Sequence, residues 1–310
     1  MSHNADFKRR RLRAVQEDVN SSARILARKA LEDLIDYALA CDAADTGELV
    51  VELDDLALQL AESRPSRVVV ANVLERWRCV LPALADQTLP EARQLAKQLA
   101  EQVIDELEQA NRQLVNLCIN EIRPGMTLMT HSCSSSVMAL FAACHADEIP
   151  VQAIVTESRP GMEGRRLARF LQKLAIPTQF ITDAQMALSV LEADKVIIGA
   201  DSLLRDGSAV TKAGSHLLAL AARDAGIPLW VLADRFKHSR TPPESIQLEE
   251  MPLEEVEFEI ETPVSFRNVY FDLLPSRLIA AWVDEREVRV TFRSLSEQPQ
   301  EPLLALPSSI

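Results

Sequence analysis

Val196-Ile-Ile-Gly-Ala-Asp201 is a short apolar run that ends in a carboxylate, and Ser202-Leu-Leu-Arg-Asp-Gly-Ser-Ala-Val-Thr211-Lys212-Ala-Gly214-Ser-His216 follows it directly. This pattern predicts a buried strand, a glycine-containing turn and a helix that begins at Gly214. Asp201 would then lie where the strand reaches solvent, and Lys212, beside a helix start, could reach a bound anion. The alternative is a surface turn in which Asp201 accepts hydrogen bonds from nearby backbone amides.

Strand-like runs followed by helical patterns recur through residues 123–293. Such alternation is typical of βαβ units, so we expect a Rossmann-like α/β domain with a doubly wound parallel sheet. Because the crossovers are right-handed, the carboxyl ends of the strands should share one edge. The predicted strands are Met126–Thr130, Val151–Thr156, Thr178–Thr182, Val196–Ala200 and Leu229–Ala233, with helices from about Ser134, Glu163, Ala184 and Gly214.

Residues 1–122 differ in composition and periodicity, since Gly47 is the only glycine and apolar residues recur at helical spacing. We predict an all-helical amino-terminal domain over 1–122 that ends in one long amphipathic helix. The turn Arg123-Pro-Gly125 marks the expected boundary to the α/β domain of 123–293. The tail 294–310, rich in Pro, Ser and Glu, is predicted to be loosely ordered.

Composition restricts the function classes. The 310 residues carry a net charge of −13 with a pI near 5.0, which argues against direct nucleic-acid binding or attachment to an anionic membrane surface. The 5 cysteines show no CxxC or metal-ligand spacing, so we predict neither a disulfide framework nor a metal site. No apolar run is long enough to span a bilayer or act as a secretion signal. We therefore expect a cytoplasmic protein.

Polar residues collect just after the predicted strand ends. They could hold a phosphorylated polyol, with Arg159 and the two lysines on phosphate and carboxylates on hydroxyl groups or protons. Polar loops are normal at such edges, so part of this clustering is expected without function. The residues are His131-Ser-Cys-Ser134, Glu157-Ser-Arg159, Asp183, Asp201, Asp234 and Lys237, together with Lys212.

Motifs for other chemistries are missing. No GxGxxG or GxxxxGK[ST] follows any predicted strand, and no GxSxG elbow supports a serine hydrolase. NAD-dependent and P-loop chemistry are therefore not expected, and we predict no cofactor. A catalytic Cys133–His131 pair is disfavoured, because residues two apart share a face only if the strand continues that far. Cys133 could instead be a small buried residue.

Several segments, in this order, resemble the alpha/beta/delta regulatory-subunit family of translation initiation factor two-B. Relatives of that family include ribose-1,5-bisphosphate isomerase and methylthioribose-1-phosphate isomerase. The resemblance covers about residues 123–285. The segments are Met129-Thr-His-Ser-Cys-Ser-Ser-Ser, Thr156-Glu-Ser-Arg-Pro-Gly-Met-Glu-Gly-Arg-Arg-Leu-Ala168, Ile198-Gly-Ala-Asp-Ser, Thr211-Lys-Ala-Gly-Ser, Ala233-Asp-Arg-Phe-Lys237 and Phe266-Arg-Asn-Val-Tyr-Phe-Asp-Leu-Leu-Pro275.

The resemblance to the isomerases implies an acid/base pair of one cysteine and one aspartate. Asp201 matches the aspartate, whereas Ser132 stands at the cysteine position and Cys133 follows one residue later. A hydroxyl is far less acidic than a thiol, and a one-residue shift on a strand turns the side chain to the other face. In this respect the Ser132-Cys133 run looks closer to the regulatory subunits.

The resemblance also implies ligands for phosphate. Arg64 matches an Arg-Pro ligand, Lys212 the lysine of an Asn-Lys pair in which Thr211 replaces Asn, and Lys237 the lysine after the last core strand. Asn20-Ser-Ser22 stands in place of an Arg-Gly-Ala motif. Ser134, Glu157 and Arg159 complete the expected substrate contacts, although Glu157 and Arg159 could instead form a loop ion pair.

Two functions follow. The first is an aldose-ketose isomerase of a 1-phosphorylated pentose, and the second is a noncatalytic initiation-factor-like protein that binds a phosphorylated sugar or nucleotide. The resemblance further implies pairing of two copies through the sheet-bearing domain. The late apolar residues Leu273, Leu274, Leu278, Ile279 and Trp282 could face that partner or pack in the core.

Overall fold

The structure is a computed structural model that describes residues 3–18, 21–64, 67–239, 241–246, 248, 250–259 and 264–291. Its amino-terminal part is helical, as predicted. Polar side chains cap the helix starts: the Asp45 carboxylate accepts from Glu48 N at 2.9 Å, and Thr88 forms a capping box with Glu91. The helices are α1 (His3–Gln16), α2 (Ala23–Ala40), α3 (Thr46–Glu62), α4 (Val68–Arg78), η1 (Leu81–Leu84) and α5 (Leu89–Ile119).

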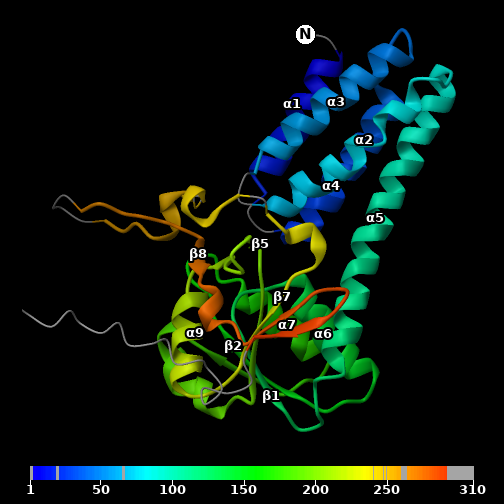
Figure 1. The fold of residues 1–310 in the computed structure, drawn as a ribbon. Coiled ribbons are helices and arrows are strands. Elements are labelled where there is room, and N and C mark those ends of the chain that lie inside the picture. Colours follow the sequence, from blue (N-terminus) through cyan, green and yellow to red (C-terminus); the bar gives the residue numbers. More distant parts are fainter. Residues whose placement is uncertain are drawn as a thin grey trace, which may run out of the picture.

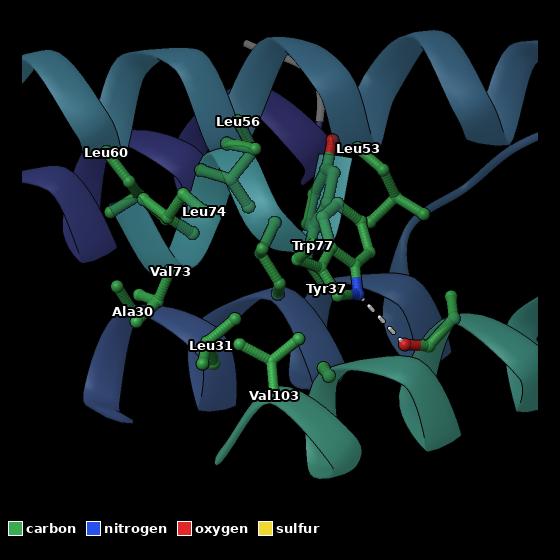
Figure 2. Close-up of a cluster of buried hydrophobic side chains, with 14 of the residues drawn as sticks. Ala30, Leu31, Tyr37, Leu53, Leu56, Leu60, Val73, Leu74, Trp77 and Val103 are labelled. Atoms are coloured by element: carbon green, nitrogen blue, oxygen red, sulfur yellow. Dashed lines mark hydrogen bonds between the residues drawn. The ribbon is translucent and has the colours of Figure 1, made fainter. Parts of the chain in front are cut away.

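A dense hydrophobic core joins these helices. Trp77 from α4 and Tyr37 from α2 are almost fully buried in it, among leucines of α2 and α3 (Figure 2). The indole N–H of Trp77 donates to the carbonyl of Ala96 on α5 at 3.2 Å, so its polar atom is satisfied inside the core.

Helix α5 connects the two parts of the molecule. Its residues up to Ala110 pack in the helical core, whereas Leu114, Val115 and Cys118 belong to the core of the sheet-bearing part. Figure 1 shows α5 running along the helical part and reaching α6 below it. The boundary near residue 123 stays a prediction, because the last turns of this helix already pack against the sheet-bearing part.

The second part confirms the predicted α/β class. Its seven-stranded sheet has the order β10-β9-β7-β4-β1-β2-β3, and all neighbours are parallel except β10 with β9. The order reverses between β4 and β1, which is where ligands bind in open α/β sheets. The strands are β1 (Thr127–Thr130), β2 (Gln152–Thr156), β3 (Thr178–Ile181), β4 (Lys195–Gly199), β7 (Leu229–Leu232), β9 (Ala281–Val283) and β10 (Val288–Val290).

Helices cover both faces of this sheet. On one face, α6 (Ser135–Ala146), α7 (Gly164–Lys173) and the end of α5 pack against alternate strand residues such as Leu128 and Ile197. On the other face, α8 (Met186–Ser189) and α9 (Ser215–Asp224) pack against Met129 and Ile198. The helix predicted from Ala184 is short, with 3-10 turns (η2, Asp183–Gln185; η3, Val190–Glu192) on either side of α8.

The segment after Asp201 differs from the predicted turn. It forms a hairpin, β5 (Ser202–Leu203) with β6 (Ala209–Lys212), which β8 (Phe271–Leu274) extends into a three-stranded antiparallel sheet. Pairing with β8 comes from about 60 residues further along the chain, so local sequence carried no signal of it. Lys212 thereby lies on a strand next to Phe271.

The late apolar residues lie mainly in the core. Leu274, Leu278, Ile279 and Trp282 are buried within the single chain, and Leu273 packs partly buried against a small cluster around Tyr270. Core packing therefore accounts for the four buried residues. The tail 294–310 lies outside the described residues. Within the described part, no helix has the length and apolar character that crossing a membrane requires.

Candidate functional site

A pocket opens at the carboxyl ends of β1 and β4, where the strand order reverses. Its floor comes from the segments that follow these strands, and its opposite wall comes from the start of α2 and from Arg67, which directly precedes α4. Asp201, Lys212 and Lys237, which are far apart along the chain, all line it. The pocket thus lies between the helical and the α/β part.

Asp201 is held across the pocket by an arginine of the helical part. Its backbone N–H donates to Val210 O at 2.9 Å, and its Oδ1 accepts from Arg67 Nη1 at 3.0 Å. The Arg67 guanidinium also lies over the Phe271 ring, 5.3 Å from its centroid. Both charged side chains are largely buried, at 10% and 18% exposure, so solvent screens their attraction only weakly.

Lys212 projects from β6 into the pocket and is paired with Glu163. The distance between Nζ and Glu163 Oε1 is 2.8 Å, and the ammonium lies 3.8 Å from the centroid of the Tyr270 ring. Glu163 Oε2 is buried and has no hydrogen-bond partner among the described residues. A ligand hydroxyl that entered the pocket would supply the donor that this oxygen lacks.

Lys237 follows β7 in a 3-10 turn (η4, Arg235–Lys237) and is 4% exposed. Burial lowers the pKa of its amine below the ordinary lysine value. Asn72 of α4 fixes this turn by donating to the carbonyls of Phe236 and His238, at 2.7 and 2.9 Å. Arg24 of α2 forms a buried ion pair with Asp234 beside it.

Ser132 and Cys133 both line the pocket, contrary to the expected alternation of faces. Strand β1 ends at Thr130, and Ser132 has a positive φ of 69°, so the chain turns before alternation could continue. Cys133 Sγ lies 3.3 Å from Arg166 Nε. Burial raises the pKa of the Cys133 thiol although the guanidinium acts in the opposite direction, so the thiol is suited to donate a proton.

His131 lines the pocket, and both of its ring nitrogens have partners in the protein. Its Nδ1 lies 2.6 Å from Thr156 Oγ1, and its Nε2 lies 2.8 Å from the Ala213 carbonyl. Burial lowers the pKa of the imidazole, so it is neutral near pH 7. These contacts tie the end of β1 to β2 and to the segment before α9. His131 is therefore engaged away from Cys133.

The starts of α6 and α9 differ in what they offer an anion. At α9, the Asp272 carboxylate already accepts from Gly214 N at 2.9 Å and His216 N at 3.2 Å. At α6, the capping residue Ser134 lines the pocket, and its buried Oγ has no partner among the described residues. The α6 start is therefore the better place for phosphate, because an anion there meets helix-start amides.

Some predicted site residues lie outside this pocket. Thr211 Oγ1 donates to Asp272 at 2.9 Å, and Arg64 Nη1 donates to the Asp18 carbonyl at 2.9 Å. The Arg159 backbone N–H donates to Asp183 at 2.6 Å, and its exposed side chain reaches the Glu255 carbonyl at 3.2 Å. Glu157 is also absent from the residues that line the pocket.

Sequence reasoning missed four charged residues that line the pocket. Arg24 and Arg67 come from the helical part, where no strand end marks a site, and Arg67 lies three residues after the Arg64 that the resemblance selected. Glu163 and Arg166 belong to the segment Thr156–Ala168, which resembles the family. Their position at the start of the predicted helix was the signal that could have identified them. The described residues contain no cluster of His, Cys, Asp and Glu that could hold a metal ion.

Comparison with known proteins agrees with this fold. The model of the initiation factor 2 subunit family matches residues 19–286. Ribose 1,5-bisphosphate isomerase from Haloferax volcanii is 32% identical, over 85% of this chain and 83% of that protein. A protein from Pyrococcus abyssi, named putative translation initiation factor eIF-2B subunit 2-like, is 36% identical over 55% of this chain, and the match spans 60% of its own length.

Among solved structures, the translation initiation factor eIF-2B of Pyrococcus horikoshii OT3 superposes with a TM-score of 0.79 at 29% identity. The match covers 92% of this chain and 97% of that one. The 5-methylthioribose 1-phosphate isomerase of the same organism superposes with a TM-score of 0.78 at 23% identity and supports the fold alone. The chain belongs to the initiation factor 2 subunit family.

Proposed function

We propose that this chain is a cytoplasmic aldose-ketose isomerase that acts on a 1-phosphorylated pentose of the ribose-1,5-bisphosphate or methylthioribose-1-phosphate type. The observation that carries the proposal is that a carboxylate, Asp201, and a thiol, Cys133, line the same pocket as Lys212 and Lys237. Relatives named ribose 1,5-bisphosphate isomerase and methylthioribose-1-phosphate isomerase support a sugar-phosphate isomerase.

The chemistry requires ring opening followed by a proton or hydride shift between C1 and C2. Cys133 is the proposed acid, because burial raises the pKa of its thiol and keeps the proton on sulfur. Asp201 is the proposed base, with Arg67 holding the carboxylate in place. Ser132 lines the pocket beside Cys133, but its hydroxyl is far less acidic, so we assign it to binding.

The phosphate is proposed to rest on Lys212 and the α6 start, and sugar hydroxyls are proposed to donate to the open oxygen of Glu163. Such a site combines charge for the anion with a hydrogen-bond acceptor for the polyol. Because Lys212 is already paired with Glu163, a bound phosphate would have to share this lysine.

NMR of isolated protein with ribose-1,5-bisphosphate and with methylthioribose-1-phosphate tests the activity. We expect isomer formation from one of them, abolished by Asp201→Asn and reduced at least tenfold by Cys133→Ser. Asp224→Asn, at an exposed position on α9, is the matched control and should be fully active. If neither sugar phosphate is converted, the proposed isomerase activity is rejected.

A second candidate function is a noncatalytic, initiation-factor-like protein that binds a sugar phosphate or nucleotide. It is favoured by Ser132 at the position where the isomerase pattern implies a cysteine, and by relatives named eIF-2B subunit 2-like. It predicts thermal stabilisation by an anionic ligand without turnover, lost in Lys212→Ala. A broad melting screen without any stabilising anion would count against it.

We also propose that the chain forms a homodimer through the sheet-bearing part. Four leucines on the neighbouring elements α8, η3 and α9 are between 45% and 69% exposed, which is typical of a covered surface. They are Leu188, Leu191, Leu217 and Leu220. Light scattering should show a dimer that Leu217→Glu with Leu220→Glu dissociates, while Val51→Glu on α3 leaves it intact; a monomeric wild type would refute the pairing.

A further inference from the structure

Lys237 differs from the other lysine of the pocket in its surroundings. Lys212 has a carboxylate at 2.8 Å, whereas no hydrogen bond or ion pair of the Lys237 amine is present among the residues that the structure describes. The side chain is 4% exposed and still lines the pocket, so the amine faces the space that a ligand would enter.

The charged side chains around Lys237 already form ion pairs with one another. Four groups act on its amine: Arg24 from α2, Arg67 before α4, Asp201 after β4 and Asp234 after β7. Arg24 pairs with Asp234, and Arg67 pairs with Asp201 at 3.0 Å. Each carboxylate near the amine is thus neutralised by a guanidinium, and a protonated Lys237 would face two like charges in a poorly solvated place.

We propose that Lys237 is a nucleophilic lysine that captures phosphorylated aldehydes as imines. The pocket brings together an amine without a counterion and the start of α6, where the buried Ser134 Oγ has no partner among the described residues and a phosphate could be held. The ligand class is a small aldehyde that carries a phosphate, such as an open-chain sugar phosphate. The inference needs the anion pocket but not the isomerase reaction.

The step balances without any further reactant. The nitrogen lone pair of Lys237 attacks the aldehyde carbon and forms the C–N bond, while the carbonyl oxygen takes up a proton. The resulting carbinolamine loses this oxygen as water, which carries away both amine hydrogens, and a neutral imine remains. Burial lowers the pKa of this amine, so a larger neutral fraction is available near pH 7 than at a surface lysine.

Pyridoxal 5′-phosphate followed by borohydride is the test. Borohydride delivers hydride to the imine carbon and fixes the adduct, which peptide mass spectrometry locates. At about pH 7.5 we expect labelling of Lys237 to be at least roughly tenfold faster than labelling of Lys173, an exposed lysine on α7. Lys212, paired with Glu163, should react slowly, and inorganic phosphate should protect Lys237.

Two comparisons keep the outcome unambiguous. Pyridoxal without phosphate should label Lys237 no faster than Lys173, because the anion site no longer helps. Lys237→Arg keeps the cation but cannot form an imine, so it should abolish the major adduct, whereas Lys173→Arg should not. Preferential labelling of Lys173 or Lys212, or equal rates with pyridoxal, would overturn the proposal. Since labelling needs no turnover, an inactive isomerase with a reactive Lys237 would refute only the proposed function.

Discussion

Arg67 and Asp201 lie 3.0 Å apart between Nη1 and Oδ1, on opposite walls of the pocket, and join the helical part to the end of β4. The pair belongs to the ligand site and to the contact between the two parts at once. Its loss should therefore affect both stability and binding.

Arg67→Gln is expected to destabilise the fold by about 1–3 kcal/mol, because it leaves a largely buried carboxylate without its cation. The effect of Arg67→Gln should be smaller in the background Asp201→Asn, where no charge remains to be neutralised. A double-mutant cycle by urea unfolding measures this coupling. Additive effects of the two substitutions would show that the ion pair does not stabilise the contact between the two parts of the molecule.

Gly199 ends β4 next to Ser134, the capping residue of α6. A Cβ at position 199 would lie 2.3 Å from Ser134 Oγ and 2.6 Å from Ser134 Cβ, so Gly199→Ala must push the α6 start away. We expect a loss of about 1–3 kcal/mol and weaker phosphate binding. Ser134→Gly removes both contacting atoms and should restore stability to Gly199→Ala. Failure of this rescue, measured by thermal unfolding, would contradict the contact.

Asp33 should make the stability depend on pH. Burial raises the pKa of its carboxyl to about 6, although Arg11 lies 2.7 Å away. The unfolded chain releases this proton near pH 4, so the folded state holds an extra proton between about pH 4 and 6. The stabilisation is complete below pH 4 and is lost as the pH rises through 6.

Asp33→Asn removes this titration. The difference in unfolding free energy, variant minus wild type, should therefore increase by about 1–3 kcal/mol from pH 4 to pH 7. Asp36→Asn, at an exposed neighbour that also pairs with Arg11, is the matched control and should show a much flatter difference. A difference for Asp33→Asn that stays constant across this range would refute the raised pKa.

Trp77 is the largest side chain in the helical core. Trp77→Ala should cost about 3–5 kcal/mol, and Trp77→Phe should cost less, because it keeps most of the apolar contact but leaves the Ala96 carbonyl without its side-chain donor. Val51→Ala, at a 67% exposed position on α3, should change stability by less than about 0.5 kcal/mol. Denaturant unfolding compares the three variants, and equal losses for Trp77→Ala and Val51→Ala would contradict the packing.

The alternation of strands and helices could be predicted from the sequence, because hydrophobic periodicity is a local property. Each predicted parallel strand is present in the structure. The sequence also indicated that Asp201 and Lys237 follow strands, and parallel topology then brings such residues to one edge. Pairing between distant segments carried no such signal. Arg67 with Asp201, and Asp272 with the start of α9, depend on side chains that meet only after the chain has folded.

The turn at Ser132 shows the same limit at a smaller scale. Alternation along a strand predicted that Ser132 and Cys133 face opposite ways, but a positive φ at Ser132 ends that rule. The orientation of Cys133, a candidate catalytic residue, thus depends on one backbone angle that strand alternation does not predict. Serine gives little warning of this conformation, which glycine or asparagine would have indicated.

Helix α5 has its two ends embedded in different hydrophobic cores. Because this helix is continuous from Leu89 to Ile119, it helps to set the distance between the two pocket walls, in addition to the contacts that pocket residues make across them. Substitutions of side chains within the cavity should therefore change the preferred ligand more readily than the distance between the cavity walls.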